Sequence, residues 1–175
     1  IQYPAVKEGD PDANFIGAGI CGLENYPWIR RLYELGGQKY FDGVALHPYT
    51  THGFQEVYRA QLDAVWQILR DYDDEAAGIW LTESAWHRGW GFRPYAKDRF
   101  GGWQESGAKH ITDLILNSEA MGVPRDRIYV FYTADHGYNE FYLMGADFAE
   151  NWPFSAAVSL QVLNECLRDA RFVRE

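Results

Sequence analysis

The sequence predicts an α/β domain built on a parallel sheet, and three observations lead to this fold class. Four short apolar runs of β-favouring residues alternate with four segments whose apolar residues recur at helical spacing. Strands and helices alternate along the chain. Because a helix connects each strand to the next, neighbouring strands are expected to be parallel. With 175 residues, 47% of them hydrophobic, the chain can bury one core but is short for two ordinary domains. We therefore treat residues 1–175 as one domain or a piece of one.

The first strand–helix unit follows an irregular opening. Residues 1–12 end in turn-forming residues and predict no strand of their own. Residues 14–20 form an apolar run that predicts a short buried strand, whose glycines allow close approach of a neighbour. Pro27 then suits the first turn of a helix. The apolar face of that helix is expected to consist of Trp28, Ile29, Leu32, Tyr33 and Leu35.

The second and third units follow the same order. A second strand is expected over 41–46, with His47-Pro48-Tyr49 at its end, and a helix over 54–72 with Val57 and Trp66 on its apolar face. The third strand covers 79–83. Residues 84–103 are expected to form a loop longer than ordinary connections, which indicates a functional or a mobile segment. The helix expected over 105–121 has the inner-face residues Ile111, Leu114, Ile115 and Ser118.

The fourth unit completes the alternation. A strand is expected over 127–132, a second long loop over 133–151, and a helix over 153–169. The apolar stripe of this last helix consists of Val158, Val162, Leu163, Cys166 and Leu167. Four parallel strands leave two unpaired edges, and we expect no further strand in the chain to cover them.

Composition excludes several classes of function. The formal net charge of -9 disfavours binding to nucleic acid or to an anionic membrane, because both would repel the chain, so a neutral substrate is expected. Two cysteines without CxxC spacing predict neither a disulfide scaffold nor structural zinc. The five histidines form neither an HxH nor an HExxH motif, so we expect no metal and no cofactor. No apolar run approaches the roughly 18 residues of a membrane span.

Glu83 is the candidate around which a site can be built. An apolar, β-favouring run over 77–82 ends in this carboxylate, and a Trp- and Gly-rich loop follows. Enzymes with parallel sheets keep their catalytic groups at the carboxyl ends of the strands, where a carboxylate can reach a bound substrate. A surface glutamate that merely closes a strand would have the same local sequence, and both readings stay open.

Several motifs, in their order along the chain, resemble a known family. They are Phe41 to Tyr49, Ile79 to Glu83, Ile128 to Tyr132 with Asp135, Phe141 to Asp147, and Trp152 to Ala157. Together they resemble the second half of a clan A retaining glycoside hydrolase, closest to the family 39 and family 5 type of (β/α)8 TIM barrel. The resemblance implies that this chain is a half-barrel of four βα units, strands five to eight, and that residues 1–7 are the tail of the fourth helix.

The resemblance also implies roles for individual residues. Glu83 would be the nucleophile, and His47 and Tyr49 would hold it ionised and oriented. Trp86, Tyr132, Asp135 and His136 would bind sugar, with Tyr132 or Phe131 in place of the Trp that the family offers on its eighth strand. Each has a structural alternative, such as a ring that caps the barrel or an apolar cluster within a long loop.

The family's second catalytic group is missing from its expected place. Its acid/base is a glutamate after an asparagine at the end of the fourth strand, and no such pair stands upstream in this chain. Asn139-Glu140 follows the last expected strand, and Asn164-Glu165 lies within the final helix. Glu24, after the first strand, is a substitute by position alone. Retaining hydrolysis needs two carboxyl groups about 5–5.5 Å apart.

Two hypotheses follow for function. The first is a retaining glycoside hydrolase that acts on the O-glycosidic bonds of a β-linked glycan, with extracellular action expected by family analogy only. The second is a non-catalytic carbohydrate-binding or structural half-barrel. In either case the expected partners are a carbohydrate and the missing N-terminal half-barrel, or a second chain that covers the sheet edges.

Overall fold

The computed structural model describes residues 2–49, 54–84, 103–131, 144–147, 150–153, 155–170 and 173. At its centre is a four-stranded sheet in the order β1-β2-β3-β4, and every neighbouring pair is parallel. The strands are β1 (Ile16–Cys21), β2 (Gly43–His47), β3 (Ile79–Ser84) and β4 (Ile128–Val130). The predicted α/β class with a parallel sheet is therefore confirmed, and the order of the strands fits a half-barrel of βα units.

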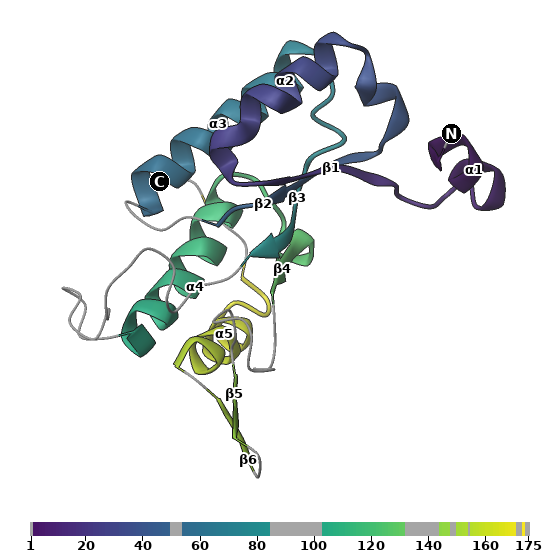
Figure 1. The fold of residues 1–175 in the computed structure, drawn as a ribbon. Coiled ribbons are helices and arrows are strands. Elements are labelled where there is room, and N and C mark those ends of the chain that lie inside the picture. The colour runs from purple at the N-terminus through teal and green to yellow at the C-terminus, as the bar shows by residue number, and fades with distance from the viewer. Residues whose placement is uncertain are drawn as a thin grey trace.

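In the described part of the chain, five α-helices accompany the sheet: α1 (Gln2–Gly9), α2 (Tyr26–Glu34), α3 (Phe54–Asp71), α4 (Trp103–Ala120) and α5 (Ser155–Cys166). Short 3-10 helices cover Leu23–Asn25, Gly37–Tyr40 and Arg125–Arg127. In Figure 1, α2, α3 and α4 lie along one side of the sheet, while α1 stands apart beyond the start of β1. The sheet is thus layered with helices on one side.

The main core lies between the sheet and these helices. Val44 and Leu46 of β2 and Ile79 and Leu81 of β3 are fully buried there. They pack with the inner face of α3 and with buried residues of α2, a set that includes Leu62, Val65, Ile68, Leu69, Ile29 and Tyr33. Apolar residues at every second strand position and at helical spacing therefore meet in one layer, as the sequence pattern predicts.

The inner face of α4 is confirmed, because Ile111, Leu114, Ile115 and Ser118 are all buried. Ile111 and Ile115 form a second cluster with partly buried residues of β4 and α5: Ile128, Val130, Ala157, Leu160 and Leu163.

The predicted apolar faces of α2 and α5 are wrong in part. Trp28 is 53% exposed and Leu35 68% exposed, although both were expected on the inner face of α2. Val158 and Val162 of α5 are also about half exposed. Ile29 and Tyr33, four residues apart, already form the buried stripe of α2, so Trp28 falls on its flank. Helical spacing identifies an apolar sector, whereas the number of neighbouring elements decides how much of that sector is covered.

Val57 of α3 differs from its prediction as well, because 47% of its surface is exposed. Trp66, on the same helix, is partly buried against the main core, as predicted.

A hairpin replaces part of the long loop predicted over 133–151. β5 (Met144–Asp147) and β6 (Glu150–Pro153) pair antiparallel, with Met144 opposite Pro153 and Asp147 opposite Glu150. As a consequence α5 begins at Ser155, two residues later than expected. Each strand is only four residues long, too short for an alternating pattern to stand out from loop sequence.

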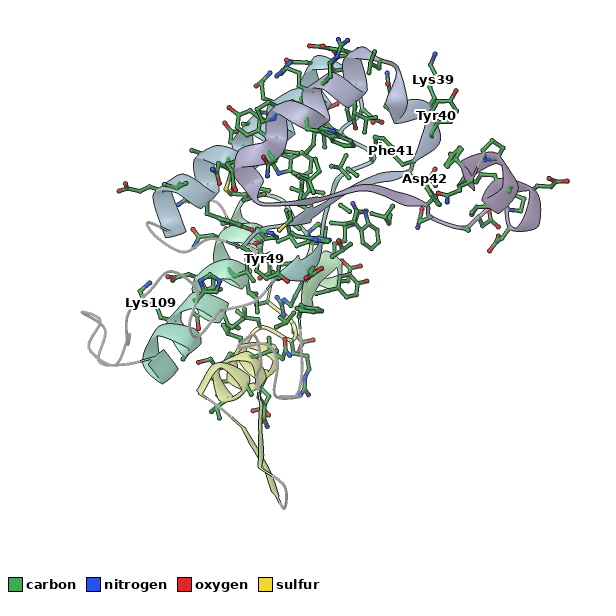
Figure 2. The ribbon with its side chains drawn as sticks, viewed as in Figure 1. Lys39, Tyr40, Phe41, Asp42, Tyr49 and Lys109 are labelled. Atoms are coloured by element: carbon green, nitrogen blue, oxygen red, sulfur yellow. The ribbon has the colours of Figure 1, made fainter. Side chains whose placement is uncertain are left out.

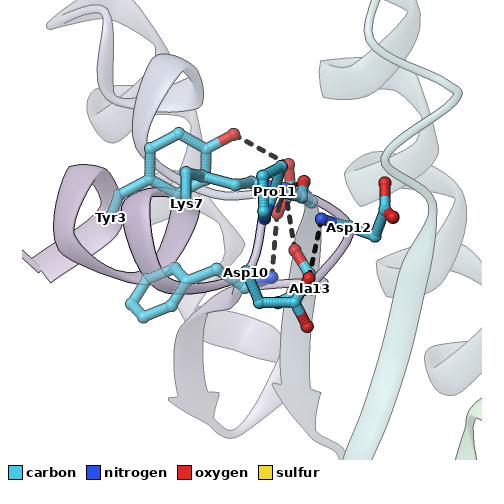
Figure 3. Close-up of polar contacts among 8 residues, drawn as sticks. Tyr3, Lys7, Asp10, Pro11, Asp12 and Ala13 are labelled. Atoms are coloured by element: carbon cyan, nitrogen blue, oxygen red, sulfur yellow. Dashed lines mark hydrogen bonds and ion pairs between the residues drawn. The ribbon is translucent and has the colours of Figure 1, made fainter.

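Helix α1 occupies residues that predict no strand, and a small polar network anchors it. Tyr3 donates to Asp42 Oδ1 over 2.8 Å, and Lys7 Nζ lies 3.0 Å from Asp42 Oδ2. Lys7 also donates to the carbonyl of Ala13 over 2.7 Å, across the turn shown in Figure 3. Asp42 completes the link by accepting from the Phe15 N–H over 2.8 Å. One carboxylate therefore joins α1 to the first strand.

Candidate active site

The site begins with an irregularity in β3. Leu81 pairs with Ile128 and Ser84 with Val130, so three steps along β3 oppose two along β4. This extra residue is a β-bulge, and it interrupts the alternation of side chains between the two faces. Strict alternation would place Glu83 with Ile79 and Leu81 on the helix side. Instead, the side chains of Thr82 and Glu83 both contact the imidazole of His47, across the sheet on β2.

Each oxygen of the Glu83 carboxylate has a close polar neighbour. His47 Nδ1 lies 3.2 Å from Oε2, and the Tyr49 hydroxyl donates to Oε1. His47 and Tyr49 therefore both lie beside Glu83, and the roles that the resemblance implies for them stay predictions. Figure 2 places Tyr49 near the middle of the molecule, next to the ends of the central strands. The Glu83 side chain remains 30% exposed, so a ligand can reach it.

Two backbone hydrogen bonds to the carbonyl of His47 fix the end of β2. The His47 carbonyl accepts from the Gly22 N–H over 3.0 Å and from the Tyr49 N–H over 2.9 Å. The second of these bonds closes a three-residue turn, which brings the Tyr49 ring back towards the sheet. The two neighbours of Glu83 therefore come from one short segment whose backbone is bonded to Gly22, the residue after β1.

Electrostatics keep Tyr49 in its donor form. Burial raises the pKa of the Tyr49 phenol well above its usual range, and the hydrogen bond to Glu83 and the charge of that carboxylate raise it further. The phenol stays protonated over the whole physiological pH range. It can therefore donate to Glu83 continuously and never competes with it as an anion.

Cys21, which the sequence analysis did not single out as a site residue, lies at the same end of the sheet. It is the last residue of β1 and pairs with His47 in the register of the sheet. Partial desolvation raises the pKa of its thiol, and the charges of Glu83 and Glu24 raise it as well. The thiol is thus neutral at physiological pH. Its place directly after the strand predicted over 14–20 was the available sequence signal.

Glu24 also lies at this end of the sheet, in the 3-10 turn Leu23–Asn25. Its carboxylate rests against Gly22, so that a side chain at position 22 would collide with it. Gly22 has a φ of 80°, a conformation that favours glycine. Since the charges of Glu24 and Glu83 both act on Cys21, two carboxylates lie near one thiol.

The rest of this sheet face is partly aromatic. Trp80 of β3 lies over Gly43 of β2, where an added Cβ would be 2.6 Å from the indole nitrogen. The guanidinium carbon of Arg127 is 4.7 Å from the centre of the Trp80 ring, a cation–π contact. Tyr129 of β4 is 49% exposed.

Four predicted sugar-binding residues, Trp86, Tyr132, Asp135 and His136, lie outside the described residues, as does Asn139-Glu140. Phe131 is described: its N–H donates to the Ser84 carbonyl over 2.8 Å. Asn164-Glu165 lies within α5, as expected.

Within the described ranges, no group of three or more His, Cys, Asp or Glu side chains is arranged to hold a metal ion. In the same part of the chain, no helix is both long and apolar enough to cross a membrane. Comparisons with protein-family models, with curated proteins and with solved structures found no match to this chain.

Proposed function

We propose that this chain is the nucleophile-bearing half of a retaining glycoside hydrolase that acts on a β-linked glycan. The observation that supports this most is the environment of Glu83, whose two carboxylate oxygens are held by His47 and Tyr49 at the end of a parallel strand. The Tyr49 hydroxyl donates to one carboxylate oxygen and His47 stands beside the other, and these contacts fix the orientation of the group. A nucleophile must be held in a fixed direction towards the carbon that it attacks.

In the proposed reaction, Glu83 attacks the anomeric carbon of the sugar. The glycosidic bond breaks while a second carboxyl group protonates the leaving oxygen, and a glycosyl ester with Glu83 forms. The same second group then takes a proton from water, which attacks the anomeric carbon and releases Glu83. Trp86, Tyr132, Asp135 and His136 are proposed to hold the sugar through stacking and hydrogen bonds.

We further propose that the four βα units are the second half of a (β/α)8 barrel, and that the acid/base comes from the other half. Supporting this, β1 and β4 are the outer strands of the sheet, and each has one neighbour within it. Exposed apolar residues also occur on α2, which follows β1 in the chain, and on the last helix, α5: Trp28, Val158 and Val162. A strand with one open edge and a helix with exposed apolar residues both favour a partner, which would add strands to the sheet and helices to the helical layer.

The test is covalent trapping. The chain, completed by the segment that supplies the other half of the barrel, is incubated with a panel of 2-deoxy-2-fluoro glycosides that carry good leaving groups. Peptide mapping is expected to find the label on Glu83. Glu83→Gln should abolish labelling, whereas Glu34→Gln, the same change on the exposed surface of α2, should leave it intact. Labelling of a different residue would overturn the assignment.

The alternative is a non-catalytic carbohydrate-binding or structural half-barrel that assembles with a partner. The two outer strands favour it, because a partner could cover them without contributing chemistry. The Glu83→Gln variant distinguishes the two functions. An enzyme would lose turnover and keep sugar binding, whereas a binding module would keep its affinity and never show turnover. The native mass of the protein shows in either case whether a second component is bound.

A further inference from the structure

Both nitrogens of His47 contact consecutive residues of β3. Nε2 lies 3.1 Å from Thr82 Oγ1, and Nδ1 lies 3.2 Å from Glu83 Oε2. Consecutive residues of a regular strand point to opposite faces, so one ring could not contact both side chains in this way. The bulge between Leu81 and Ser84 makes the double contact possible.

The proton positions follow from the chemistry of the partners. An ionised carboxylate only accepts hydrogen bonds, so His47 Nδ1 must carry a proton to bond Glu83. In a neutral imidazole the other nitrogen is then an acceptor, and Nε2 needs a donor. The Thr82 hydroxyl is the group within reach, and it can donate.

We propose that Thr82 is a positioning residue, whose hydroxyl donates to His47 Nε2 and holds the neutral ring in the Nδ1–H form facing Glu83. A role for Thr82 in catalysis rests on the proposed function, whereas the assignment of the hydrogen bond between Thr82 and His47 does not. A threonine suits this role because its branched Cβ restricts the side chain to few rotamers. Thr82 and His47 are both partly buried, which limits the competition from water for these bonds.

The experiment uses the 175-residue chain, labelled with ¹⁵N-histidine, and two variants. Long-range ¹H–¹⁵N spectra distinguish a protonated ring nitrogen from an unprotonated one, and they are recorded at a pH where the rings are neutral. The wild type is expected to show a protonated Nδ1 and an unprotonated Nε2 at His47. Thr82→Ser, which keeps the hydroxyl, should give the same pattern. Thr82→Val keeps the shape of the side chain and removes the hydroxyl. This variant should show His47 as a mixture of the Nδ1–H and Nε2–H tautomers.

His110 serves as an internal control, because it is a buried histidine of α4. Its signals should stay unchanged in both variants. A wild-type His47 protonated on Nε2 would overturn the proposal outright, even if Thr82→Val failed to fold. An unchanged His47 pattern in Thr82→Val would also overturn it, as would His47 and His110 signals that change together. These spectra require no turnover, so they test the positioning role separately from the trapping experiment. The positioning role can be confirmed even if Glu83 is not labelled, and Glu83 can be labelled even if the positioning role is wrong.

Discussion

The two faces of the sheet use the same strands for different purposes. On the helix side, Leu46, Ile79 and Leu81 are fully buried and contribute apolar area to the core. On the other side, the same strands present His47, Thr82 and Glu83, partly exposed and joined by polar contacts. The bulge of β3 moves Glu83 from the first set to the second. Side chains that stabilise the fold and side chains that form the candidate site are thus separated by direction, not by distance along the chain.

The largest effect is expected from Leu81→Ala. Leu81 is fully buried, and truncation of a buried leucine costs about 2–5 kcal/mol through lost burial and the cavity that remains. Two residues along, Glu83→Gln should change the free energy of unfolding by no more than about 1 kcal/mol, because the amide oxygen can still accept from Tyr49 and only the charge of the acceptor is lost. Denaturant unfolding of both variants measures the difference between their free energies of unfolding. Similar losses of stability in the two would mean that the faces are not separated as described.

A second prediction concerns pH and the helix side. Burial lowers the pKa of His110, on α4, from 6.5 to about 4. Between these two values the unfolded chain binds the proton and the folded chain does not, so the free energy of unfolding should fall as the pH drops from about 6.5 towards 4. A shift of this size corresponds to a loss on the order of 3 kcal/mol.

The control for this pH effect is His110→Gln, which cannot titrate. Carboxylates also protonate in acid, so the informative quantity is the difference between the pH profiles of wild type and variant. That difference should be concentrated between about pH 4 and 6.5. Parallel profiles would contradict the burial of a neutral His110.

Two tyrosines offer a matched comparison of the faces. The hydroxyl of Tyr58, fully buried on the helix side, lies 2.5 Å from Ser118 Oγ, and Tyr58→Phe should lower the free energy of unfolding by about 1 kcal/mol. Tyr49→Phe removes a hydrogen bond to a carboxylate, worth about 1.5–3 kcal/mol. If that bond strengthens catalysis, labelling of Glu83 by the fluoro glycoside should slow by about 10- to 100-fold.

The two variants are expected to differ in the labelling rate: Tyr58→Phe lowers stability and spares the labelling rate, whereas Tyr49→Phe slows labelling. Thermal unfolding and the labelling time course are measured on both variants. A Tyr49→Phe protein that is labelled at the wild-type rate would remove Tyr49 from the proposed machinery.

The smallest effect is expected at α1, which is joined to the sheet mainly through Asp42 (Figure 3). Hydrogen bonds, first of all from the Phe15 N–H, lower the pKa of Asp42 below its ordinary 3.8. Its stabilising contribution is therefore present above pH 3.8 and is lost as the pH falls through the lower, folded-state value. Asp42→Asn should speed hydrogen exchange in residues 2–9 while leaving the global free energy of unfolding within about 0.5 kcal/mol. Unchanged exchange in those amides would show that other contacts hold α1.

Much of the fold could be predicted because its signals are local. The four strands and the four helices of the repeating units occur where apolar runs and helical spacing place them. The hairpin β5–β6 was missed because its strands are too short to have a period. The exposure of Trp28 was missed because it depends on which elements lie beside α2, and spacing within one helix carries no such information.

The candidate site divides in the same way. That Glu83 ends a strand, and that His47 and Tyr49 end its neighbour, can be read from the order of residues. Glu24 could be placed after the first strand from the sequence, whereas the position of Cys21 beside His47 required the register of β1 on β2. The part played by Thr82 required the bulge, which arises from pairing with β4 and leaves no mark in the residues 81–84 themselves.

The sequence by itself determined an α/β chain with parallel units and a carboxylate at the end of its third strand, since side-chain periodicity and strand order are properties of neighbouring residues. Only the tertiary structure decided which face that carboxylate occupies and which donors it meets. The physical reason is that a one-residue irregularity in strand pairing reverses the direction of a side chain, and such pairing is an interaction between segments far apart in the chain.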